Sequence, residues 1–449
     1  MLYTQILTTF VHFVYRNAQI YKLLCSMIYM TEELNNILQM QKRELEIKVN
    51  ELYIQRDANF KKPEDNLIRV IIGPRRAGKS TFAIHRLKEF GTFAYINFDN
   101  EKLVELKDYD ELLTKIKTRY NDPDYIVLDE IQNLPKWELF VNRLQRSNYK
   151  LVITGSNSNL LSGELATHLT GRYIPIYIFS FSFREFLNLK TTELTNHEKK
   201  AALDEFLSTG GYPEPLVKKL DLVNYISLLF DAIIYKDIVK RYKIRAPQRI
   251  ENLANYLISN LAAFYSYNTL KDVTVCKSIH TIDKYIKYLE ETFILFRIYK
   301  FSFKVKEQIR SNKKVYCFDN GFITAKAFKM SQDKGKIYEN TVAMELKKAQ
   351  ISGKLKFYYW KNQQNEEIDF VITENEKISK LVQVCVDLAN PDTKNREIRA
   401  LLKGSRDLKC QNLIIITEDY DDEKEEEWFG IKGKIKYLPL WKWLLEKGY

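Results

Sequence analysis

Glycine, proline and cysteine are scarce in this sequence. With 15 glycines and 10 prolines in 449 residues, it has far less of either than a low-complexity or collagen-like chain. The five cysteines are scattered and odd in number, and none forms a C-x-x-C pair, which argues against a zinc site and a disulfide framework. We therefore expect a folded protein of a reducing compartment, the cytoplasm.

A long uncharged apolar run is also missing at the N-terminus. The first 30 residues are apolar, but Arg16 and Lys22 interrupt them before about 18 uncharged residues accumulate, and no small-residue cleavage site follows. We expect no membrane span. Two alternatives stay open for this segment, which is either an extension upstream of a start at Met27 or Met30, or a peripheral membrane anchor.

The length and the charge of the chain indicate a multidomain protein. A chain of 449 residues with 45% hydrophobic content exceeds what one core supports, so we expect two to four domains. Lys and Arg number 70 against 58 Asp and Glu, a net charge of +12 that favours phosphate-bearing partners such as nucleic acid. General solubilising charge explains this surplus equally well.

The most specific motif is GPRRAGKS, a full match to the phosphate-binding pattern G-x-x-x-x-G-K-[ST]. It follows an apolar stretch, Ile68 to Ile72, that predicts a buried strand, and it precedes a helix expected from Lys79. In this setting Lys79 reaches the β- and γ-phosphates of ATP, and the Ser80 hydroxyl binds Mg²⁺. The predicted nucleotide-binding residues are Gly73, Pro74, Arg75, Arg76, Ala77, Gly78, Lys79, Ser80 and Thr81.

A pair of acidic residues follows a later apolar strand. The segment TFAYINFD predicts a second strand, and DYIVLDE predicts a third that ends in Asp129 and Glu130. Asp129 is then placed to hold Mg²⁺, and Glu130 to orient or deprotonate the attacking water. Two adjacent acids after a strand are also common in turns, but downstream of the GPRRAGKS motif they indicate a nucleotide-hydrolysis site.

Two further candidates lie at strand ends. A fourth strand, YKLVITGS, runs towards Asn157, whose amide is suited to bind the γ-phosphate or the water, although a simple turn explains it equally well. Arg172 precedes a fifth strand and is suited to stabilise the transferred phosphoryl group, in its own chain or from a neighbouring subunit. On pattern alone, a surface arginine is the slightly favoured interpretation of Arg172.

Taken together, these motifs resemble the archaeal AAA-type ATPases that carry a C-terminal domain of unknown function. The matching blocks are IIGPRRAGKST, AYINFDNEKL, VLDEIQNLPKWELFVNRL, TGSNSNLLSGELATHLTGRY, FSFREFL, GGYPEPL, YKDIVKRYKIR, IYENTVAMEL, EEIDFVI and LVQVCVDL. The resemblance implies an α/β fold with a P-loop NTPase (AAA+-like) core, and it raises Arg172 above a surface residue. The implied domains are an N-terminal helical extension (1–60), the ATPase core (61–182), a helical lid (183–245), a winged-helix segment (246–330) and a C-terminal α/β domain similar to PD-(D/E)xK nucleases (331–449).

The middle of the chain fits a winged helix. A helix is expected from about Thr281, followed by the strand ILFRIYKFS, the basic loop KVKEQIRSNKK and the strand KVYCFD. Lys284 and Lys287 are then able to face DNA phosphates. Winged helices that only dock proteins are an equally good interpretation.

The C-terminal part departs from the nuclease pattern. Asp369 fits the first acidic position and Glu339 the helical one, but the triplet that needs a lysine reads Gln383, Val384 and Cys385. Cysteine does not replace a lysine's charge, so nuclease activity is doubtful and a fold retained for binding is favoured over a metal site. The acidic run TEDYDDEKEEEWFG predicts a solvated loop.

These features predict an ATPase that uses ATP and Mg²⁺ and couples hydrolysis to conformational work on DNA or on a DNA-associated partner. Its expected catalytic residues are Glu130, Lys79, Arg172 and Asn157, and its metal ligands are Ser80 and Asp129. A nucleotide-dependent regulatory or signalling switch that binds a protein partner is the alternative, and a small-molecule phosphotransferase is a third. The sequence leaves open whether the chain forms a homo-oligomer.

Overall fold

The computed structural model describes residues 32–106, 108–155, 169, 171–190, 193–327 and 333–446. Residues 32–48 are helical and lead, through an irregular segment, into the first sheet. A second N-terminal helix, which the sequence left open, is not formed in residues 49–59. Over the described ranges, no helix is long and apolar enough to cross a membrane.

The first part of the chain is a parallel sheet between helices. Within the described residues the sheet has five strands in the order β2-β3-β4-β1-β5, and all neighbouring strands run parallel. Its strands are β1 (Ile68–Ile72), β2 (Phe93–Asn97), β3 (Tyr125–Asp129), β4 (Lys150–Gly155) and β5 (Tyr173–Tyr177). Helices α2 (Lys79–Lys88), α4 (Tyr109–Tyr120) and α5 (Trp137–Arg146) flank it, with the short α3 (Glu101–Val104) and η1 (Ile131–Asn133) near strand ends.

Alternating residues of the central strands explain why both faces of this sheet are covered. Val70 and Ile72 pack into one core cluster, whereas Ile71 between them packs into another with α2. Strands that are buried on both faces read as continuous apolar runs, which is the pattern of β1 and β3. The predicted strands and the helix at Lys79 are confirmed.

A helical segment follows the sheet, as predicted for residues 183–245. Two of its helices begin with capping boxes, in which Ser182 and Glu185, and then Thr195 and Glu198, satisfy each other's backbone N–H groups. The helices are α8 (Phe183–Leu187), α9 (Asn196–Thr209), α10 (Pro213–Lys218), α11 (Leu222–Ala232) and the π-helix η2 (Ile233–Lys240). Helix α11 continues directly into η2, and π-helical turns are frequent at functional sites.

The middle part combines helices with a two-stranded antiparallel ribbon. Its elements are α12 (Pro247–Ser259), α13 (Tyr267–Thr274), α14 (Ile279–Glu291), β6 (Leu295–Ile298), α15 (Val305–Arg310), β7 (Lys314–Cys317) and α16 (Asn320–Lys326). The helix expected from Thr281 and both strands are present. The basic segment between the strands is not a plain loop as expected, because it contains the short helix α15.

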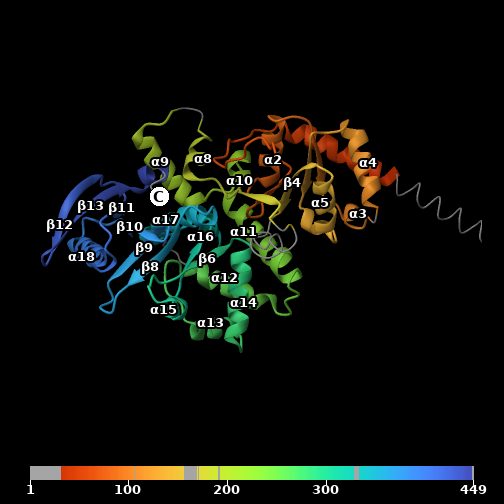
Figure 1. Cartoon of the computed structure of the whole chain (residues 1–449). Coiled ribbons are helices and arrows are strands. Elements are labelled where there is room, and N and C mark those ends of the chain that lie inside the picture. Colours follow the sequence, from red (N-terminus) through yellow and green to blue (C-terminus); the bar gives the residue numbers. More distant parts are fainter. Residues whose placement is uncertain are drawn as a thin grey trace, which may run out of the picture.

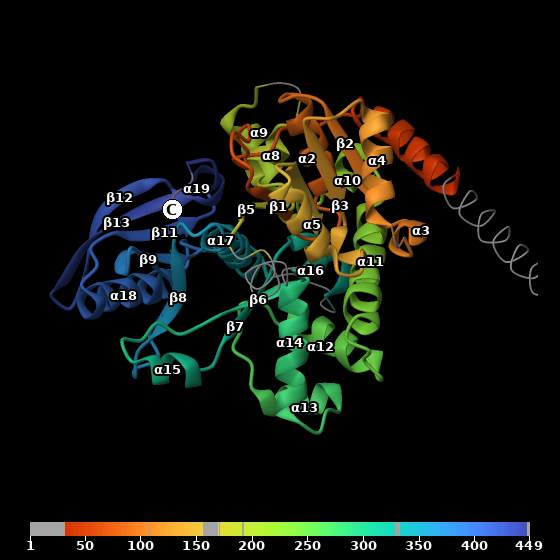
Figure 2. The same cartoon turned by 45° about the vertical axis from the view of Figure 1, so that its right-hand side comes forward.

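The last part is a mixed sheet with helices. In the described part of the chain it has six strands in the order β12-β13-β11-β10-β9-β8. Its elements are α17 (Lys334–Ile351), β8 (Lys356–Lys361), β9 (Glu367–Glu374), β10 (Lys377–Val384), α18 (Pro391–Leu408), β11 (Leu413–Thr417), β12 (Asp422–Trp428), β13 (Ile431–Pro439) and α19 (Leu440–Glu446). Figures 1 and 2 show α17 between this sheet and the rest of the molecule.

The predicted solvated loop over the acidic run TEDYDDEKEEEWFG is wrong. Half of this run, residues 422–428, forms β12, which pairs antiparallel with β13. Lysines of β13 face the acids of β12 on the neighbouring strand. Lys434 lies 2.8 Å from Glu423, and Lys432 lies 3.3 Å from Glu427. Opposite charges on neighbouring strands favour the pairing that a run of like charges alone would oppose.

Candidate nucleotide-binding site

The GPRRAGKS loop joins the carboxyl end of β1 to the N-terminus of α2. A Cβ atom on Gly73 would lie 1.7 Å from the carbonyl oxygen of Ile178, so only glycine fits there. Gly78, with φ of 88°, precedes the first residue of α2 in a conformation that favours glycine. The sequence thus forms a tight loop whose backbone N–H groups and helix N-terminus suit an anion.

Lys79 is buried at the base of this loop. Its Nζ donates a hydrogen bond to the carbonyl oxygen of Pro74 at 2.9 Å. Burial lowers the pKa of Lys79, while the carboxylates of Glu130 and Asp129 oppose that change. A buried ammonium next to two carboxylates is suited to receive the charge of a phosphate.

Asp129 ends β3 directly beside the loop. Its Oδ1 accepts a hydrogen bond from the Ser80 hydroxyl at 2.8 Å, and the hydroxyls of Thr154 and Tyr95 also donate to the carboxylate. Burial, and then the charge of Glu130, raise the pKa of Asp129. A carboxylate and a hydroxyl are oxygen ligands that Mg²⁺ prefers, so the predicted pair fits this ion.

Sequence reasoning missed Tyr95 and Thr154. Tyr95 is the middle residue of β2 and Thr154 lies near the carboxyl end of β4, and a residue with a hydroxyl group among apolar neighbours was the available signal. Burial raises the pKa of Tyr95, and the adjacent charge of Asp129 raises it further. The phenol therefore stays a hydrogen-bond donor that fixes the Asp129 carboxylate.

Glu130 lies next to Asp129 and faces the same cavity. Its backbone has a φ of 51°, its N–H donates to the Thr154 hydroxyl at 3.1 Å, and the Gln132 amide donates to its carboxylate. The turn after β3 and the side chain of Gln132 thus hold Glu130 in place. This geometry suits a group that orients a water molecule.

A cavity of about 490 Å³ lies in front of these residues. It is lined by the loop and the strand ends, by the segment that precedes β1, and by α10. The residues from outside the loop and strand ends include Lys48, Glu51, Leu52, Tyr53, Ile54, Arg56, Pro213, Glu214, Val217 and Lys218. A cavity of this size is typical of small-molecule sites.

Ion pairs connect the loop to the helical segment. Arg75 Nη1 lies 3.2 Å from Oδ1 of Asp237 on η2, and Arg76 Nη1 lies 3.4 Å from Oε2 of Glu214 on α10. The Glu214 carboxylate also accepts a hydrogen bond from Tyr225 at 2.7 Å. Burial raises the pKa of Asp237, and the charge of Arg75 opposes this. The helical segment therefore contacts the loop through charged side chains.

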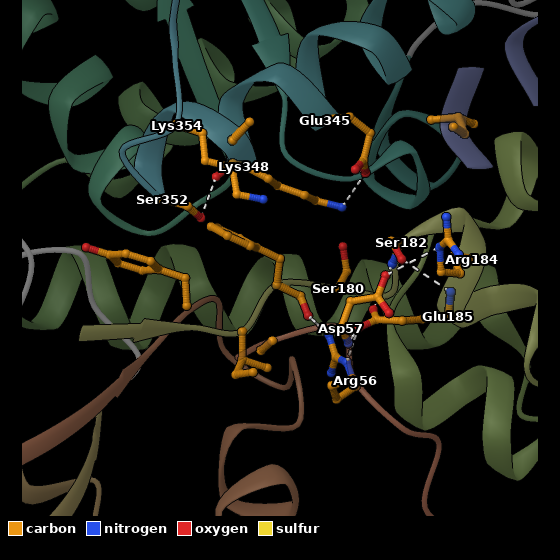
Figure 3. A pocket seen from close by; sticks show the side chains of 16 residues that line it. Arg56, Asp57, Ser180, Ser182, Arg184, Glu185, Glu345, Lys348, Ser352 and Lys354 are labelled. Atoms are coloured by element: carbon orange, nitrogen blue, oxygen red, sulfur yellow. Dashed lines mark hydrogen bonds and ion pairs between the residues drawn. The ribbon is translucent and has the colours of Figure 1, made fainter. Parts of the chain in front are cut away.

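Arg56, which the sequence did not single out, anchors the loop and lines the cavity. Its guanidinium donates to the carbonyl oxygen of Ala77 at 2.8 Å, to Oε1 of Glu185 at 3.0 Å, and to the carbonyl oxygen of Phe179. Figure 3 shows Arg56 and Glu185 on one wall of a smaller cavity. That cavity, of about 150 Å³, lies between the ATPase-like core and α17.

One predicted residue lies away from this site, and another is not described by the structure. Asn157 lies outside the described residues. Arg172 is exposed at the start of β5, where its carbonyl oxygen accepts a hydrogen bond from Ile68 N–H at 3.0 Å. Because β1 and β5 are parallel, Arg172 lies at the amino edge of the sheet and the loop at the carboxyl edge, about 15 Å away for a five-residue strand. Thr81 lines the cavity as predicted.

Comparisons with known proteins divide the chain into three segments. The AAA domain family matches residues 65–187, the Domain of unknown function (DUF8612) matches residues 200–333, and the Domain of unknown function (DUF4143) matches residues 334–443. The segment that matches the AAA domain family contains the GPRRAGKS loop, Asp129, Glu130 and Arg172.

Two relatives match along nearly their whole length. An uncharacterized protein of Methanocaldococcus jannaschii is 35% identical over 425 residues, which are 89% of this chain and 93% of the relative. An uncharacterized protein of Haemophilus influenzae is 31% identical over 415 residues, which are 88% and 98% of the two chains. Among solved structures, "Structure of C. elegans PCH-2" is similar over 57% of this chain and 67% of its own, with 11% identity and a TM-score of 0.22.

Proposed function

We propose that this chain, which belongs to the same protein family as its relatives from Methanocaldococcus jannaschii and Haemophilus influenzae, binds ATP with Mg²⁺ and hydrolyses it in its AAA domain. The observation that carries the proposal is the cluster of Lys79, Ser80, Asp129 and Glu130 at one edge of the cavity. We also propose that residues 183–245 form a lid, residues 246–330 a winged-helix segment and residues 331–449 a nuclease-like domain.

The residues of the site divide the work between them. Backbone N–H groups of the loop bind the phosphates, and Lys79 exchanges its bond to Pro74 for a phosphate oxygen. Ser80 and Asp129 hold the metal ion. Glu130, fixed by Gln132, orients the attacking water and accepts its proton. The chemistry that Mg²⁺ supplies when bound is neutralisation of charge on the phosphates.

Arg172 and Asn157 complete the proposal. Since Arg172 is exposed at the opposite edge of its own sheet, we propose that it acts on the γ-phosphoryl group of a neighbouring copy. For Asn157 we keep the role of binding the γ-phosphate or the water. A homo-oligomer is therefore part of the proposed mechanism.

The helical segment is the proposed lid. The phosphates of ATP compete with Asp237 and Glu214 for the two arginines of the loop, because they carry more negative charge at the same place. Binding thereby weakens the contacts of α10 and η2 in their present position. The lid moves in response and transmits the change to the middle and C-terminal parts.

DNA, or a partner bound to DNA, is the proposed target. Two observations support it: Lys284 and Lys287 are exposed on α14, and the segment 299–313 carries five Lys and Arg residues against one Glu. Of these five cations Lys304, Lys306 and Arg310 are exposed, and exposed cations suit phosphate contacts. The alternative, a nucleotide-dependent switch that binds a protein, is favoured by three exposed apolar side chains around α15, which are those of Phe303, Val305 and Ile309.

The test is ATP hydrolysis by the full chain with Mg²⁺, with and without single- and double-stranded DNA, at two salt concentrations. Lys79→Ala should abolish turnover, and the matched variant Lys88→Ala, on the exposed end of the same helix, should not. Stimulation by DNA that fades with salt supports the first target, because phosphate contacts release counterions. Lys79-dependent turnover indifferent to DNA selects the switch, and full turnover by Lys79→Ala refutes the ATPase.

A further inference from the structure

A buried lysine lies at the centre of three carboxylates, far along the chain from the nucleotide site. The Nζ atom of Lys314 lies 3.0 Å from Oε1 of Glu339, 2.6 Å from Oε1 of Glu367 and 3.5 Å from Oδ1 of Asp369. The Lys314 side chain is 4% exposed. The lysine comes from β7 of the ribbon, whereas the carboxylates come from α17 and β9 of the C-terminal part.

Other groups of the protein also donate hydrogen bonds to this carboxylate cluster. Oδ2 of Asp369 accepts a hydrogen bond from Val384 N–H at 3.0 Å, and Oε1 of Glu339 accepts one from the Tyr316 hydroxyl at 2.7 Å. The side-chain carbonyl of Gln383 accepts a hydrogen bond from the Asp369 N–H at 3.2 Å. This carbonyl, considered from the sequence as a metal ligand, is thus used within the protein.

The charge balance keeps the lysine in its ammonium form. Burial by itself lowers the pKa of Lys314, but the charge of Glu339, followed by those of Asp369 and Glu367, outweighs burial and raises it well above the usual range. A buried charge of this kind is stable only with partners of opposite charge. The cluster provides them, and the ammonium offsets part of their negative charge, while burial, and then the charge of Glu339, raise the pKa of Asp369 well above its usual range.

Next to the cluster, α17 presents a strip of buried polar side chains to the ribbon. Asn340 Oδ1 accepts a hydrogen bond from Cys317 N–H at 2.7 Å, and Asn340 Nδ2 donates to Asn320 Oδ1 at 2.8 Å. Thr341 Oγ1 accepts one from Asn320 Nδ2 at 2.9 Å. Asn340 and Thr341 are both 0% exposed. The block IYENTVAMEL therefore places three consecutive polar residues against the ribbon and the first residue of α16.

Backbone contacts extend this interface to the C-terminal sheet. Phe301 N–H donates to the carbonyl oxygen of Tyr359 at 2.6 Å, and Tyr359 N–H donates to the carbonyl oxygen of Tyr299 at 3.1 Å. Figure 2 shows β6 and β7 reaching from the middle part towards β8 and α17. The ribbon is thus attached to the C-terminal part by side chains and backbone together.

The cluster does not fit the metal ion that a nuclease-like domain implies. Converging carboxylate oxygens are what Mg²⁺ would use, but here they surround the Lys314 ammonium, which donates a hydrogen bond to Glu339 and forms ion pairs with Glu367 and Asp369. Throughout the described ranges, no group of three or more His, Cys, Asp and Glu side chains is arranged to hold a metal. In this cluster the Lys314 ammonium lies at the centre of the three carboxylates.

We propose that Lys314 is the resident cation of this cluster: it takes the place of a divalent metal, so that the nuclease-like domain binds the ribbon of its own chain instead of cleaving nucleic acid. The C-terminal part is then a docking module that fixes the middle part, and its acidic residues are retained for that contact. This inference is independent of ATP hydrolysis, since no nucleotide-binding residue belongs to the cluster.

The test is a Mn²⁺ titration of the nucleotide-free full chain, with free Mn²⁺ followed by electron paramagnetic resonance. Lys314→Met should gain one Mn²⁺ site, at least about tenfold tighter than any in the wild type, and Lys314→Met with Asp369→Asn should lose it. The matched control is Lys361→Met. It removes a cation 3.5 Å from the other oxygen of Glu367 and leaves the centre filled, so it should bind as the wild type does.

A wild type whose Mn²⁺ binding is removed by Asp369→Asn alone overturns the proposal, as does a folded Lys314→Met that gains no site. If Lys314→Met does not fold, plasmid nicking with Mg²⁺ or Mn²⁺ decides. Wild type and Asp369→Asn should then be equally inactive, and cleavage by the wild type that depends on Asp369 refutes the inference. Loss of ATP turnover in Lys79→Ala affects neither result.

Discussion

Replacing Arg56 by methionine tests how the nucleotide-binding loop is held in place. Methionine keeps much of the length of the side chain but removes all three guanidinium contacts, to Ala77, Phe179 and Glu185. Arg56 is 9% exposed and Glu185 is 4% exposed, so water does not replace the lost partners. We expect a large loss of stability and a weaker nucleotide site together.

The magnitude follows from these contacts. Removing one partner of a buried ion pair costs about 3–5 kcal/mol, because the other charge is left without compensation. Glu185 keeps two backbone donors, Asp57 N–H at 2.7 Å and Ser182 N–H at 2.9 Å, which limits the cost. We therefore expect the free energy of unfolding to fall by about 3 kcal/mol, the lower end of that range.

Urea unfolding followed by circular dichroism measures this loss of stability. Titration with a fluorescent ATP analogue measures the Kd of the nucleotide-binding loop for the nucleotide. The Kd should rise at least about tenfold, or about 1.4 kcal/mol, because the carbonyl of Ala77 loses its anchor. Arg184→Met is the matched control. Its side chain is 43% exposed, lies 3.8 Å from Asp57 and donates a hydrogen bond to the carbonyl oxygen of Leu445, so a smaller loss of about 1 kcal/mol is expected. An Arg56→Met protein with wild-type stability and Kd would refute the reasoning.

Two further predictions concern stability. Burial raises the pKa of Glu366, but its contacts with Lys403 (2.8 Å) and Arg399 (3.0 Å) outweigh burial and lower it. The stabilisation is therefore present above the unfolded-state pKa of about 4.3 and is lost as the pH falls through the lower folded-state pKa. Urea unfolding should show Glu366→Gln less stable than the wild type by about 2 kcal/mol at pH 7. This difference should shrink below about pH 4, and a difference that stays constant with pH would contradict the reasoning. Gly73→Ala, whose Cβ would lie 1.7 Å from the Ile178 carbonyl, should lower the Tm by about 6 °C or more, and an unchanged Tm would contradict the close packing.

Features that depend on neighbouring residues in the chain were predictable. The strand of Ile68–Ile72, the loop and the helix from Lys79 form one continuous segment, and its apolar run and glycines carry the signal. Asp129 and Glu130 follow an equally clear apolar strand. Parallel strands place their carboxyl ends at one edge, so the approach of Ser80 to Asp129 also followed from the pattern.

Features that depend on residues far apart in the chain were not predictable from the sequence. The acidic run of β12 by itself predicts a loop, and it forms a strand because it pairs with β13, whose lysines lie opposite its acidic residues. Arg56 lies in an irregular segment with no motif, and its three acceptors lie 21, 123 and 129 positions away from it in the chain. The missing lysine of the nuclease pattern gave a doubt about cleavage, but nothing near it in sequence indicated that Lys314 would fill the centre of the cluster.

Both edges of the C-terminal sheet are protected from joining strands of other molecules. An edge strand exposes unpaired N–H and C=O groups to which another chain can add a strand. At one edge, β12 carries a row of exposed acidic side chains that repel an identical strand. At the other, residues 299–301 form backbone hydrogen bonds with Tyr359 of β8. Open-ended growth of this sheet into fibres is disfavoured at either side, and the protein gains resistance to aggregation without a proline or a bulge in β12.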